Sequence, residues 1–303
     1  MTARSPFSRL VVVERTGSTN TDLRRALTGP DGGLDPVASV RWPHLSALRA
    51  RTQTAGRGRA DHVWTTPATG ALTASIVVRP LVPNTRLHWL PLLAGLAVSR
   101  ALAPRLSGSG WNTATKWPND VIALPGPATC APAAVPGWGS SRKLAGVLTE
   151  MVTPGARGPV PTGAAVPASR DAAVAVIVGI GVNLAQDAQQ LPVPWAASLA
   201  SLGAVDTAAG PLLDDCGRSL AELVSLWESV GGDPDAGDGA LGRQLRSACA
   251  TLGQAVRVNG PAGEVAGVAV DLSPGLVLQV GDGAGARRIE VTAGDVTAVR
   301  ERN

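Results

Sequence analysis

The sequence predicts an α/β region over residues 1–250, followed by a small β-barrel over residues 251–303. Two observations support this division, and the length is ordinary for about two domains. Up to residue 250, apolar runs typical of buried strands alternate with segments whose apolar residues recur at helical spacing. From Gly253 onward only short strand-like runs occur, separated by Gly, Pro and Asp turns, which is typical of a small barrel.

The expected elements follow from these patterns. In the first region, strands are expected at Leu10–Glu14 (buried), Val37–Val40, Leu72–Val78, Val121–Leu124, Leu144–Val152 and Ala173–Val178. Helices are expected from Thr19 to Gly29, at Pro83–Leu106, at Leu212–Trp227 and near Ala240–Thr251. In the barrel, strands are expected at Val256–Val258, Glu264–Asp271, Leu276–Val280, Arg288–Val291 and Val296–Arg300.

Three of these segments have further features. Thr19 is expected to cap the first helix, with Asp22 completing a capping box. The helix at Pro83–Leu106 is apolar on all sides, which indicates a central position or a subunit interface, and Pro91 either starts it or kinks it. The segments Pro125–Ser141 and Thr153–Ala172 are rich in Pro, Gly and Ala, so we expect them to be surface insertions.

Composition excludes several classes of protein. The net charge is +4 and the pI about 9.6, yet no run of Lys and Arg marks a nucleic-acid-binding tail. No apolar stretch is long enough to cross a membrane, and no secretory signal is present. Cys130, Cys216 and Cys249 are few and widely spaced, which fits a reducing cytoplasm rather than a disulfide framework or a metal cluster. We therefore expect a cytoplasmic protein with no membrane or nucleic-acid partner.

The choice of cation is unusual. Of 27 Lys and Arg residues, only Lys116 and Lys143 are lysine, which leaves 25 arginines. An ammonium group is a compact point charge on a flexible stem, and a planar guanidinium does not replace it everywhere. Because both lysines also fall inside short, unusual motifs, we expect them to be working residues.

A glycine-rich basic segment extends over residues 51–64. Gly56 and Gly58 interrupt it, which favours a loop whose backbone approaches a ligand closely. Arg57 and Arg59 add two permanent cations, and that combination suits a phosphate whose negative charge grows during a reaction. A solvated basic turn gives the same local pattern, so other motifs must decide between the two interpretations.

Four further motifs are Gly17-Ser-Thr-Asn20, Lys116-Trp-Pro-Asn-Asp120, Lys143-Leu-Ala-Gly-Val147 and Gly179-Ile-Gly-Val-Asn183. From spacing alone, helix capping is the better interpretation of the first. Asn119 and Asp120, held behind Pro118 at a strand entrance, suit a base, a metal, an amine or a simple turn. Neither a dinucleotide-binding fingerprint nor a P-loop is present, because position 184 is Leu and neither lysine is followed by Ser or Thr.

Together, in this order and spacing, the five motifs resemble those of the biotin–protein ligases, over nearly the whole chain. The resemblance implies a mixed-sheet α/β catalytic domain related to class II aminoacyl-tRNA synthetases, followed by an SH3-like barrel. Two departures are present. Ala60-Asp61-His62 follows Arg59 where many relatives have more basic residues. Gly17 also comes too early for the N-terminal DNA-binding domain of bifunctional relatives, so no DNA binding is expected.

The resemblance implies a role for each motif residue. Biotin binding is implied for Ser18, Thr19, Asn20, Gln53, Gly56, Arg57, Lys143, Gly146, Gly179 and Gly181. ATP binding is implied for Arg57, Arg59, Trp64, Lys116, Asn119 and Asn183, with Trp64 stacked on adenine. Catalytic roles are implied for Lys143, Arg59, Lys116 and Asp120, and Asp120 either ligates Mg²⁺ or orients the incoming amine.

The implied reaction has two steps. Biotin and ATP, with Mg²⁺, give biotinyl-5′-AMP and pyrophosphate, and a lysine of a biotin carboxyl carrier domain of an acyl-CoA carboxylase then takes the biotin. A homodimer is possible. Three other functions fit parts of the sequence: a lipoate–protein ligase, a biotin-binding regulator without ligase activity, and an inactive scaffold. The glycine-rich loop with Lys116-Trp-Pro-Asn-Asp120 favours the biotin branch over lipoate, and the retained lysines argue against a scaffold.

Overall fold

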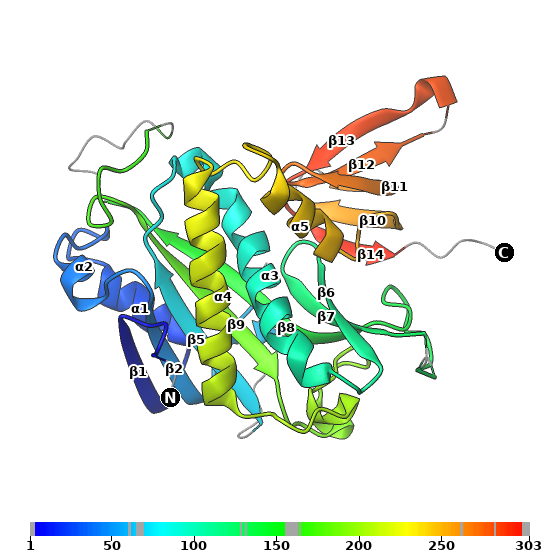
Figure 1. The fold of residues 1–303 in the computed structure, drawn as a ribbon, viewed down its shortest axis with the longest axis horizontal. Helices are drawn as coiled ribbons and strands as arrows, with labels where there is room; N and C mark the ends of the chain where they lie inside the picture. The colour runs from blue at the N-terminus through cyan, green and yellow to red at the C-terminus, as the bar shows by residue number, and fades with distance from the viewer. Residues whose placement is uncertain are drawn as a thin grey trace.

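The computed structural model describes residues 4–298, except 60–61, 65–69, 128, 131, 155–162, 164, 261–262 and 282. The larger of its two main sheets has seven strands in the order β1-β2-β5-β9-β8-β7-β6, and only the β1–β2 pair is parallel (Figure 1). The smaller sheet has five antiparallel strands in the order β13-β12-β11-β10-β14. The short strands β3 and β4 form a separate pair.

The strands are β1 (Arg9–Thr16), β2 (Ser46–Gln53), β3 (Gly56–Arg57), β4 (Val63–Trp64), β5 (Ala71–Val78), β6 (Trp111–Lys116), β7 (Asp120–Pro125), β8 (Arg142–Val152), β9 (Ala175–Asn183), β10 (Ala255–Gly260), β11 (Gly263–Leu272), β12 (Leu276–Val280), β13 (Arg287–Val291) and β14 (Asp295–Ala298). The α-helices are α1 (Thr19–Leu27), α2 (Ala38–Arg41), α3 (Leu90–Leu102), α4 (Ala209–Ser229) and α5 (Ala240–Ala248). Short 3₁₀ turns are Asn84–Trp89, Ala103–Leu106, Ala188–Gln190, Ala200–Leu202 and Gly283–Gly285.

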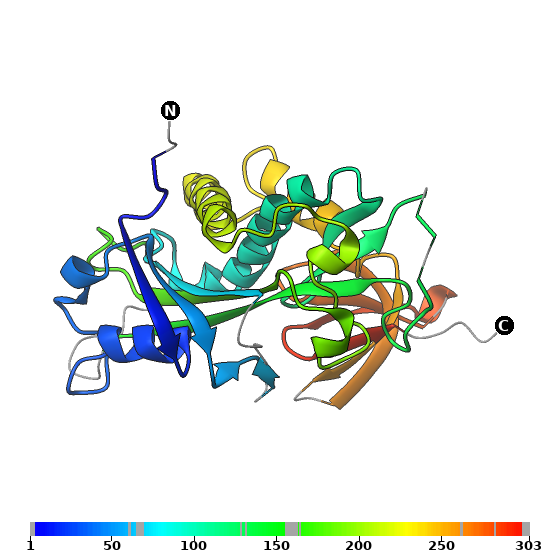
Figure 2. The same ribbon diagram turned by 90° about the horizontal axis from the view of Figure 1, so that it is seen from below.

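Helices cover both faces of the large sheet. Figure 2 shows α3 and α4 on one face and α1 on the other. The alternation of side chains along β9 follows this arrangement, since Val176 and Val178 belong to the core under α3 and α4, whereas Ala175 and Ile177 belong to the smaller core under α1. A strand buried on both faces therefore reads as the continuous apolar run seen in the sequence.

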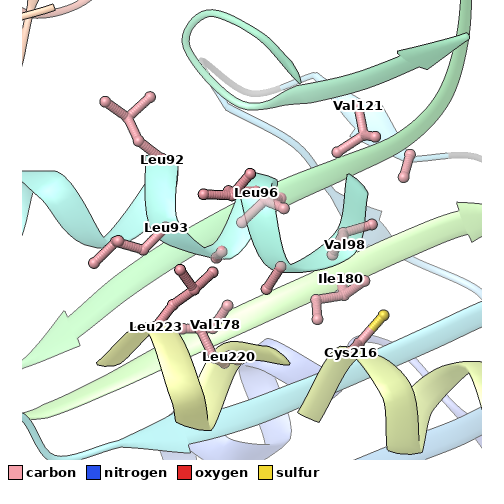
Figure 3. Packing of buried hydrophobic residues seen from close by; sticks show 14 of the residues in the cluster. Leu92, Leu93, Leu96, Val98, Val121, Val178, Ile180, Cys216, Leu220 and Leu223 are labelled. Atoms are coloured by element: carbon pink, nitrogen blue, oxygen red, sulfur yellow. The ribbon is translucent and has the colours of Figure 1, made fainter. Parts of the chain in front are cut away.

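Helix α3 lies at the centre of the main core (Figure 3), where Leu93 and Leu96 pack near Leu220 and Leu223 of α4. The expected central position of this helix is thus confirmed. It is shorter than expected, because Pro91 lies in its first turn and starts it, and 3₁₀ turns form both flanks. The expected strands in the middle of the sheet and the helix before Gly231 are also confirmed, and β9 continues through its glycines to Asn183.

The glycine-rich segment 51–64, expected to be a loop, instead contains the end of β2 and the paired strands β3 and β4. Three further local expectations are wrong. Strand β1 is not buried: it is an edge strand, and Leu10 and Val12 on its open face are exposed. Residues 37–40 do not form a strand, because Ala38 packs into the core while Val37 and Val40 point outward, and one helical turn forms instead. Packing of a single small residue overrides the β propensity of the two valines here.

The third correction concerns the start of α1. The N-cap is Ser18, whose hydroxyl accepts a hydrogen bond from the Thr21 backbone N–H at 3.4 Å. Thr19 is already helical, and Asp22 accepts a hydrogen bond from the Thr16 hydroxyl instead of closing a capping box. Thr19 and Asn20 are therefore free of the capping role and are buried toward the sheet.

The smaller sheet begins at Ala255 and contains the five strands expected after Gly253, although residues 299–300 of the last one lie outside the described part. Val256 and Val258 belong to the same continuous core as Trp117 and Cys249. The two sheets therefore share apolar packing, and β14 comes to lie beside the β6–β7 turn. Within the expected insertion at 153–172, residues 155–162 and 164 lie outside the described part. No helix among those described is long and apolar enough to cross a membrane.

Candidate active site

A cavity of about 460 Å³ lies where the start of α1, the β6–β7 turn and β14 meet strands β5, β8 and β9. Every site residue predicted from the sequence lines this cavity except Gly56, which lines an adjoining pocket under the glycine-rich loop. Additional lining residues are Thr73, His62, Trp138, Trp195, Asp295, Val296 and Thr297.

Glycines make the floor of the cavity flat. Gly146 on β8 and Gly181 on β9 are direct neighbours across the two strands, and the indole of Trp64 lies against both. A Cβ on Gly181 would come within 2.5 Å of Cε2 of Trp64, and one on Gly146 within 3.2 Å of Cζ3. A Cβ on Gly179 would come within 2.3 Å of Oδ1 of Asn20. The glycines are therefore required by close approach of side chains, not by unusual backbone angles.

Neutral polar side chains form one end of the cavity. The Thr19 backbone N–H donates to Oε1 of Gln53 at 2.9 Å. The Ser75 hydroxyl lies 2.7 Å from the Thr19 hydroxyl and 2.6 Å from Oδ1 of Asn20. These groups are buried and hold one another in place, so this end presents a preformed set of amide and hydroxyl groups to a ligand.

Glu150, which the sequence analysis did not single out, fastens this end to the glycine-rich loop. Its carboxylate accepts hydrogen bonds from Nδ2 of Asn20 at 2.8 Å and from Nη2 of Arg57 at 2.6 Å, and it pairs with Arg24 at 3.2 Å. Burial raises the pKa of Glu150, but the hydrogen bonds from Asn20 and Arg57, with the charges of Arg57 and Arg24, outweigh burial and lower it below its ordinary value. Arg57 thus lines the cavity while its guanidinium is bound to Glu150.

Lys143 and Asp120 form an ion pair at 2.6 Å near the middle of the cavity. Pairing of β7 with β8 places Asp120 opposite Gly146, and the Asn119 side chain donates to the Val147 carbonyl at 2.9 Å. The Lys143 ammonium also lies 5.7 Å from the ring centroid of Trp64. Two of the motifs recognised in the sequence therefore meet through one short ion pair.

Lys116 occupies the opposite end of the cavity. Its ammonium donates to the Val296 carbonyl on β14 at 3.0 Å and lies 3.7 Å from the ring centroid of Trp138. Burial lowers the pKa of Lys116; the charge of Asp120 counteracts this and the charge of Lys143 adds to it. This end of the cavity is therefore cationic and partly desolvated.

Two donors that line the cavity are buried without a hydrogen-bond partner among the described residues. They are Nη1 of Arg59 and Nε1 of Trp64. Burial lowers the pKa of Arg59, and the charges of Asp295 and Asp120 only partly counteract it. Buried N–H groups without partners are costly unless a ligand supplies the acceptor, so this region suits an anion.

Asn183 has structural partners already. Its Nδ2 donates to the Ala197 carbonyl at 3.1 Å, and its Oδ1 accepts from the Gln186 side chain at 3.3 Å. Asn183 therefore fixes the segment after β9, which carries Trp195 into the cavity wall.

Among the residues of the site that sequence reasoning missed, three differ in the signal they left. Glu150 is an acidic residue inside an otherwise apolar strand, and that is a usable signal. Trp138 is a large aromatic residue in a segment otherwise rich in Pro, Gly and Ala, so the expectation of a purely surface insertion at 125–141 is wrong for this residue. Val296 accepts the Lys116 hydrogen bond through its backbone carbonyl, and every residue type has such a carbonyl, so the sequence gives no signal for it.

Comparison with known proteins relates this geometry to a family. The Biotin/lipoate A/B protein ligase family matches residues 34–158. The biotin–[acetyl-CoA-carboxylase] ligase of Mycobacterium tuberculosis is 32% identical over 98% of this chain and 92% of its own length. The chain belongs to the biotin–protein ligase family. Another relative, the bifunctional ligase/repressor BirA of Bacillus spizizenii, is 29% identical over 52% of this chain and 38% of its own length.

Solved structures of biotin protein ligases have the same fold. The enzyme from Aquifex aeolicus in complex with biotin and ATP aligns with a TM-score of 0.64 at 21% identity, covering 97% of this chain and all of that one. A biotin protein ligase-like protein of unknown function from Silicibacter aligns with a TM-score of 0.58 at 15% identity. The mixed α/β fold expected from the resemblance is thus confirmed, and the C-terminal antiparallel sheet is consistent with an SH3-like unit.

Proposed function

We propose that this protein activates biotin with ATP to biotinyl-5′-AMP and transfers biotin to a lysine of a biotin carboxyl carrier domain. One observation carries the proposal: a single cavity joins a preformed neutral polar end, around Thr19 and Gln53, to a cationic part lined by both lysines and Arg59. Biotin has a neutral ureido ring at one end and a carboxylate at the other, and ATP supplies the second anion. The likeness to the Mycobacterium tuberculosis ligase supports the same reaction.

The first step brings two anions together. The biotin carboxylate oxygen attacks the α-phosphorus of ATP, and pyrophosphate leaves. Lys143 contacts the carboxylate and the phosphoryl oxygens, while Arg59 supplies its unpartnered N–H groups to the phosphates and Lys116 adds charge. The protein forms no covalent bond, so catalysis consists of positioning and charge stabilisation.

The second step uses the mixed anhydride. The amine of the acceptor lysine attacks the biotinyl carbonyl carbon, AMP leaves, and an amide forms. Asp120 holds Lys143 at 2.6 Å, so Lys143 keeps its direction in both steps. Trp64 lies across Gly146 and Gly181 and covers the floor on which the adenylate would rest, so it moves or stacks as ligands enter.

Mg²⁺ enters with the triphosphate. Asp120 and Asp295 are the carboxylates that line the cavity, and one or two carboxylates together with phosphate oxygens are a usual Mg²⁺ environment. The described residues contain no cluster of three or more His, Cys, Asp or Glu side chains. When bound, the ion neutralises charge on the phosphates.

Further parts of the proposal concern organisation. We place a catalytic domain at residues 1–250 and an SH3-like domain at 251–303, with β14 of the second completing the cavity of the first. The proposed acceptor is the carrier domain of an acyl-CoA carboxylase. A cytoplasmic location is supported by three cysteines that are all free, and homodimer formation is compatible with the exposed edge strand β1.

The test is pyrophosphate release from ATP and Mg²⁺ with biotin, with lipoate, or with no added acid. We expect release with biotin alone. Release with lipoate instead would keep the mechanism and change the substrate, while no release with either acid would remove the ligase proposal. A second assay follows transfer of biotin to an isolated carrier domain, which separates an enzyme from a biotin-binding regulator.

A further inference from the structure

The segment before β8 carries Trp138 on a tight turn. The Val135 backbone N–H donates to the Gly139 carbonyl at 2.8 Å, and the Trp138 N–H donates to the Val135 carbonyl at 2.9 Å. Gly137 and Gly139, on either side of the tryptophan, have φ angles of 76° and 56°, a left-handed conformation that favours glycine. The sequence Gly-Trp-Gly therefore builds a defined turn.

The indole of Trp138 has a rigid support. Its ring stacks on Trp195 with centroids 5.8 Å apart and planes 9° from parallel. Trp195 is itself fixed to β8, because its carbonyl accepts the Lys143 backbone N–H at 2.7 Å and the Lys143 carbonyl accepts the Ala197 N–H at 2.9 Å. Trp138 is thus held from both its own turn and the strand that carries the other lysine.

The Trp138 ring also contacts Lys116. The ammonium lies 3.7 Å from the ring centroid, well within the distance at which a cation is attracted to an aromatic face. Lys116 has no carboxylate within 4.0 Å among the described residues, unlike Lys143, which pairs with Asp120 at 2.6 Å. Both lysines therefore face an indole, Lys143 at the longer distance of 5.7 Å from Trp64, but only Lys143 is also held by a carboxylate.

The difference matters for charge. A carboxylate partner fixes an ammonium but also cancels its charge, whereas an aromatic face attracts the cation without a compensating negative charge. The Val296 carbonyl takes one of the three N–H donors of Lys116. The ammonium thus has a fixed position, and two of its three donors have no hydrogen-bond partner among the described residues.

We propose that Trp138 is a positioning residue, which holds the Lys116 ammonium at the cationic end of the cavity for the phosphates of ATP. This inference rests on the proposed function, and it assigns a task to the segment 125–141. Trp138 acts through Lys116 and touches no reacting atom.

The test replaces Trp138 by Leu and by Phe. Trp138→Leu removes the aromatic face, and we expect the KM for ATP to rise about three- to thirtyfold, the range of a cation–π contact, with the KM for biotin unchanged. Trp138→Phe keeps a smaller face and should give an intermediate rise. Thermal melting of each variant shows whether it is folded.

The same substitution in a Lys116 variant shows whether Trp138 acts through Lys116 or only supports the fold. In Lys116→Met, the ammonium is gone, so adding Trp138→Leu should produce little further rise in the KM for ATP. Trp42→Leu is the matched control, because it removes a cation–π contact with Arg9 at 4.5 Å outside the cavity. It should leave the KM for ATP unchanged.

Two results would overturn the inference: an unchanged KM for ATP in folded Trp138→Leu, or the same rise in the presence and absence of Lys116. Failure of the proposed function is a different result, since the unaltered protein then releases no pyrophosphate with either acid. In that case, calorimetric titration with Mg·ATP or inorganic pyrophosphate measures the same variants without turnover. A loss of affinity that depends on Lys116 would sustain the inference, and equal affinities would end it.

Discussion

The two ends of the cavity differ in how their polar groups are satisfied. At the neutral end, Thr19, Asn20, Gln53 and Ser75 bond to one another within 2.6–3.3 Å. Toward the cationic end, Nη1 of Arg59 is a buried donor without a partner among the described residues, and so is Nε1 of Trp64 above the glycine floor. A satisfied network fixes the shape of a binding site before the ligand arrives, whereas unsatisfied donors gain most when the ligand brings negative charge. Substitutions at the two ends should therefore have different consequences.

The largest effect is expected for Lys143→Arg. The charge is kept, but the Lys143 ammonium lies between Asp120 and the space above Gly146, 3.7 Å from a Cβ at that glycine, and a planar guanidinium does not fit that geometry. We expect adenylation to fall by about 10²–10³-fold, measured as biotin-dependent pyrophosphate release. Lys116→Arg is the comparison variant, and its adenylation rate should fall much less. Near-normal release in Lys143→Arg would remove Lys143 from its assigned role.

Gly181→Ala should be next. The added Cβ would lie 2.5 Å from the Trp64 ring, so the ring must shift. A misplacement of about 1 Å at a reacting site costs roughly 10²-fold in rate. Gly17→Ala is the matched control, since a Cβ there meets nothing within 4 Å. Rates and biotin affinities are compared for both variants. Equal behaviour of the two would show that Trp64 has no fixed place over the floor.

Glu150→Gln tests the link between the neutral end and the loop. Losing the charge partner of Arg57 should lower the Tm by about 3–6 °C at pH 7. Because the folded pKa of Glu150 is lowered from 4.5, its contribution is complete above that ordinary value and is lost as pH falls through the folded pKa. The Tm difference from the unaltered protein should therefore shrink on acidification.

The control for this variant is Glu14→Gln, which breaks an exposed ion pair with Arg51 at 2.9 Å. Exposed pairs contribute little, so its Tm should hardly change at any pH. A constant Tm difference for Glu150→Gln between pH 7 and pH 3 would contradict the role given to its carboxylate.

The smallest effect concerns the glycine-rich loop itself. We expect biotin to slow tryptic cleavage after Arg57 severalfold, because Gly56 and Gly58 allow the loop to order over the ligand. In Glu150→Gln the unliganded loop should be cut faster, and biotin should then protect it by a larger factor. Equal cleavage near Arg57 with and without biotin would exclude ordering of the loop by that ligand.

The elements that the sequence predicts correctly are those with a strong local pattern. Strands β5, β8 and β9 and helix α4 are long, strongly apolar segments, and their positions follow from periodicity alone. Residues 37–40 were misjudged because burial of Ala38 against distant elements decides their conformation. Ser18 and Thr19 are adjacent and similar in capping preference, so only the structure separates the cap from the residue that turns toward Gln53.

The same limit applies to the site. The sequence predicts that Lys116 and Asp120 lie in one site because they belong to the same short motif. Glu150 meets Arg24 across 126 positions of sequence and Lys116 meets Val296 across 180. Pairings at such separations depend on strand order and on the packing of the second sheet, which no local pattern specifies.

The contact between Lys116 and the Val296 carbonyl also orders events during synthesis of the protein. Helix α1 and Gln53 emerge from the ribosome early, whereas β14 follows every other strand that the structure describes. The neutral end can therefore assemble while translation continues, but the cationic end lacks one wall until Val296 has been made and β14 has paired with β10. A nascent chain thus lacks the complete cavity until β14 is in place.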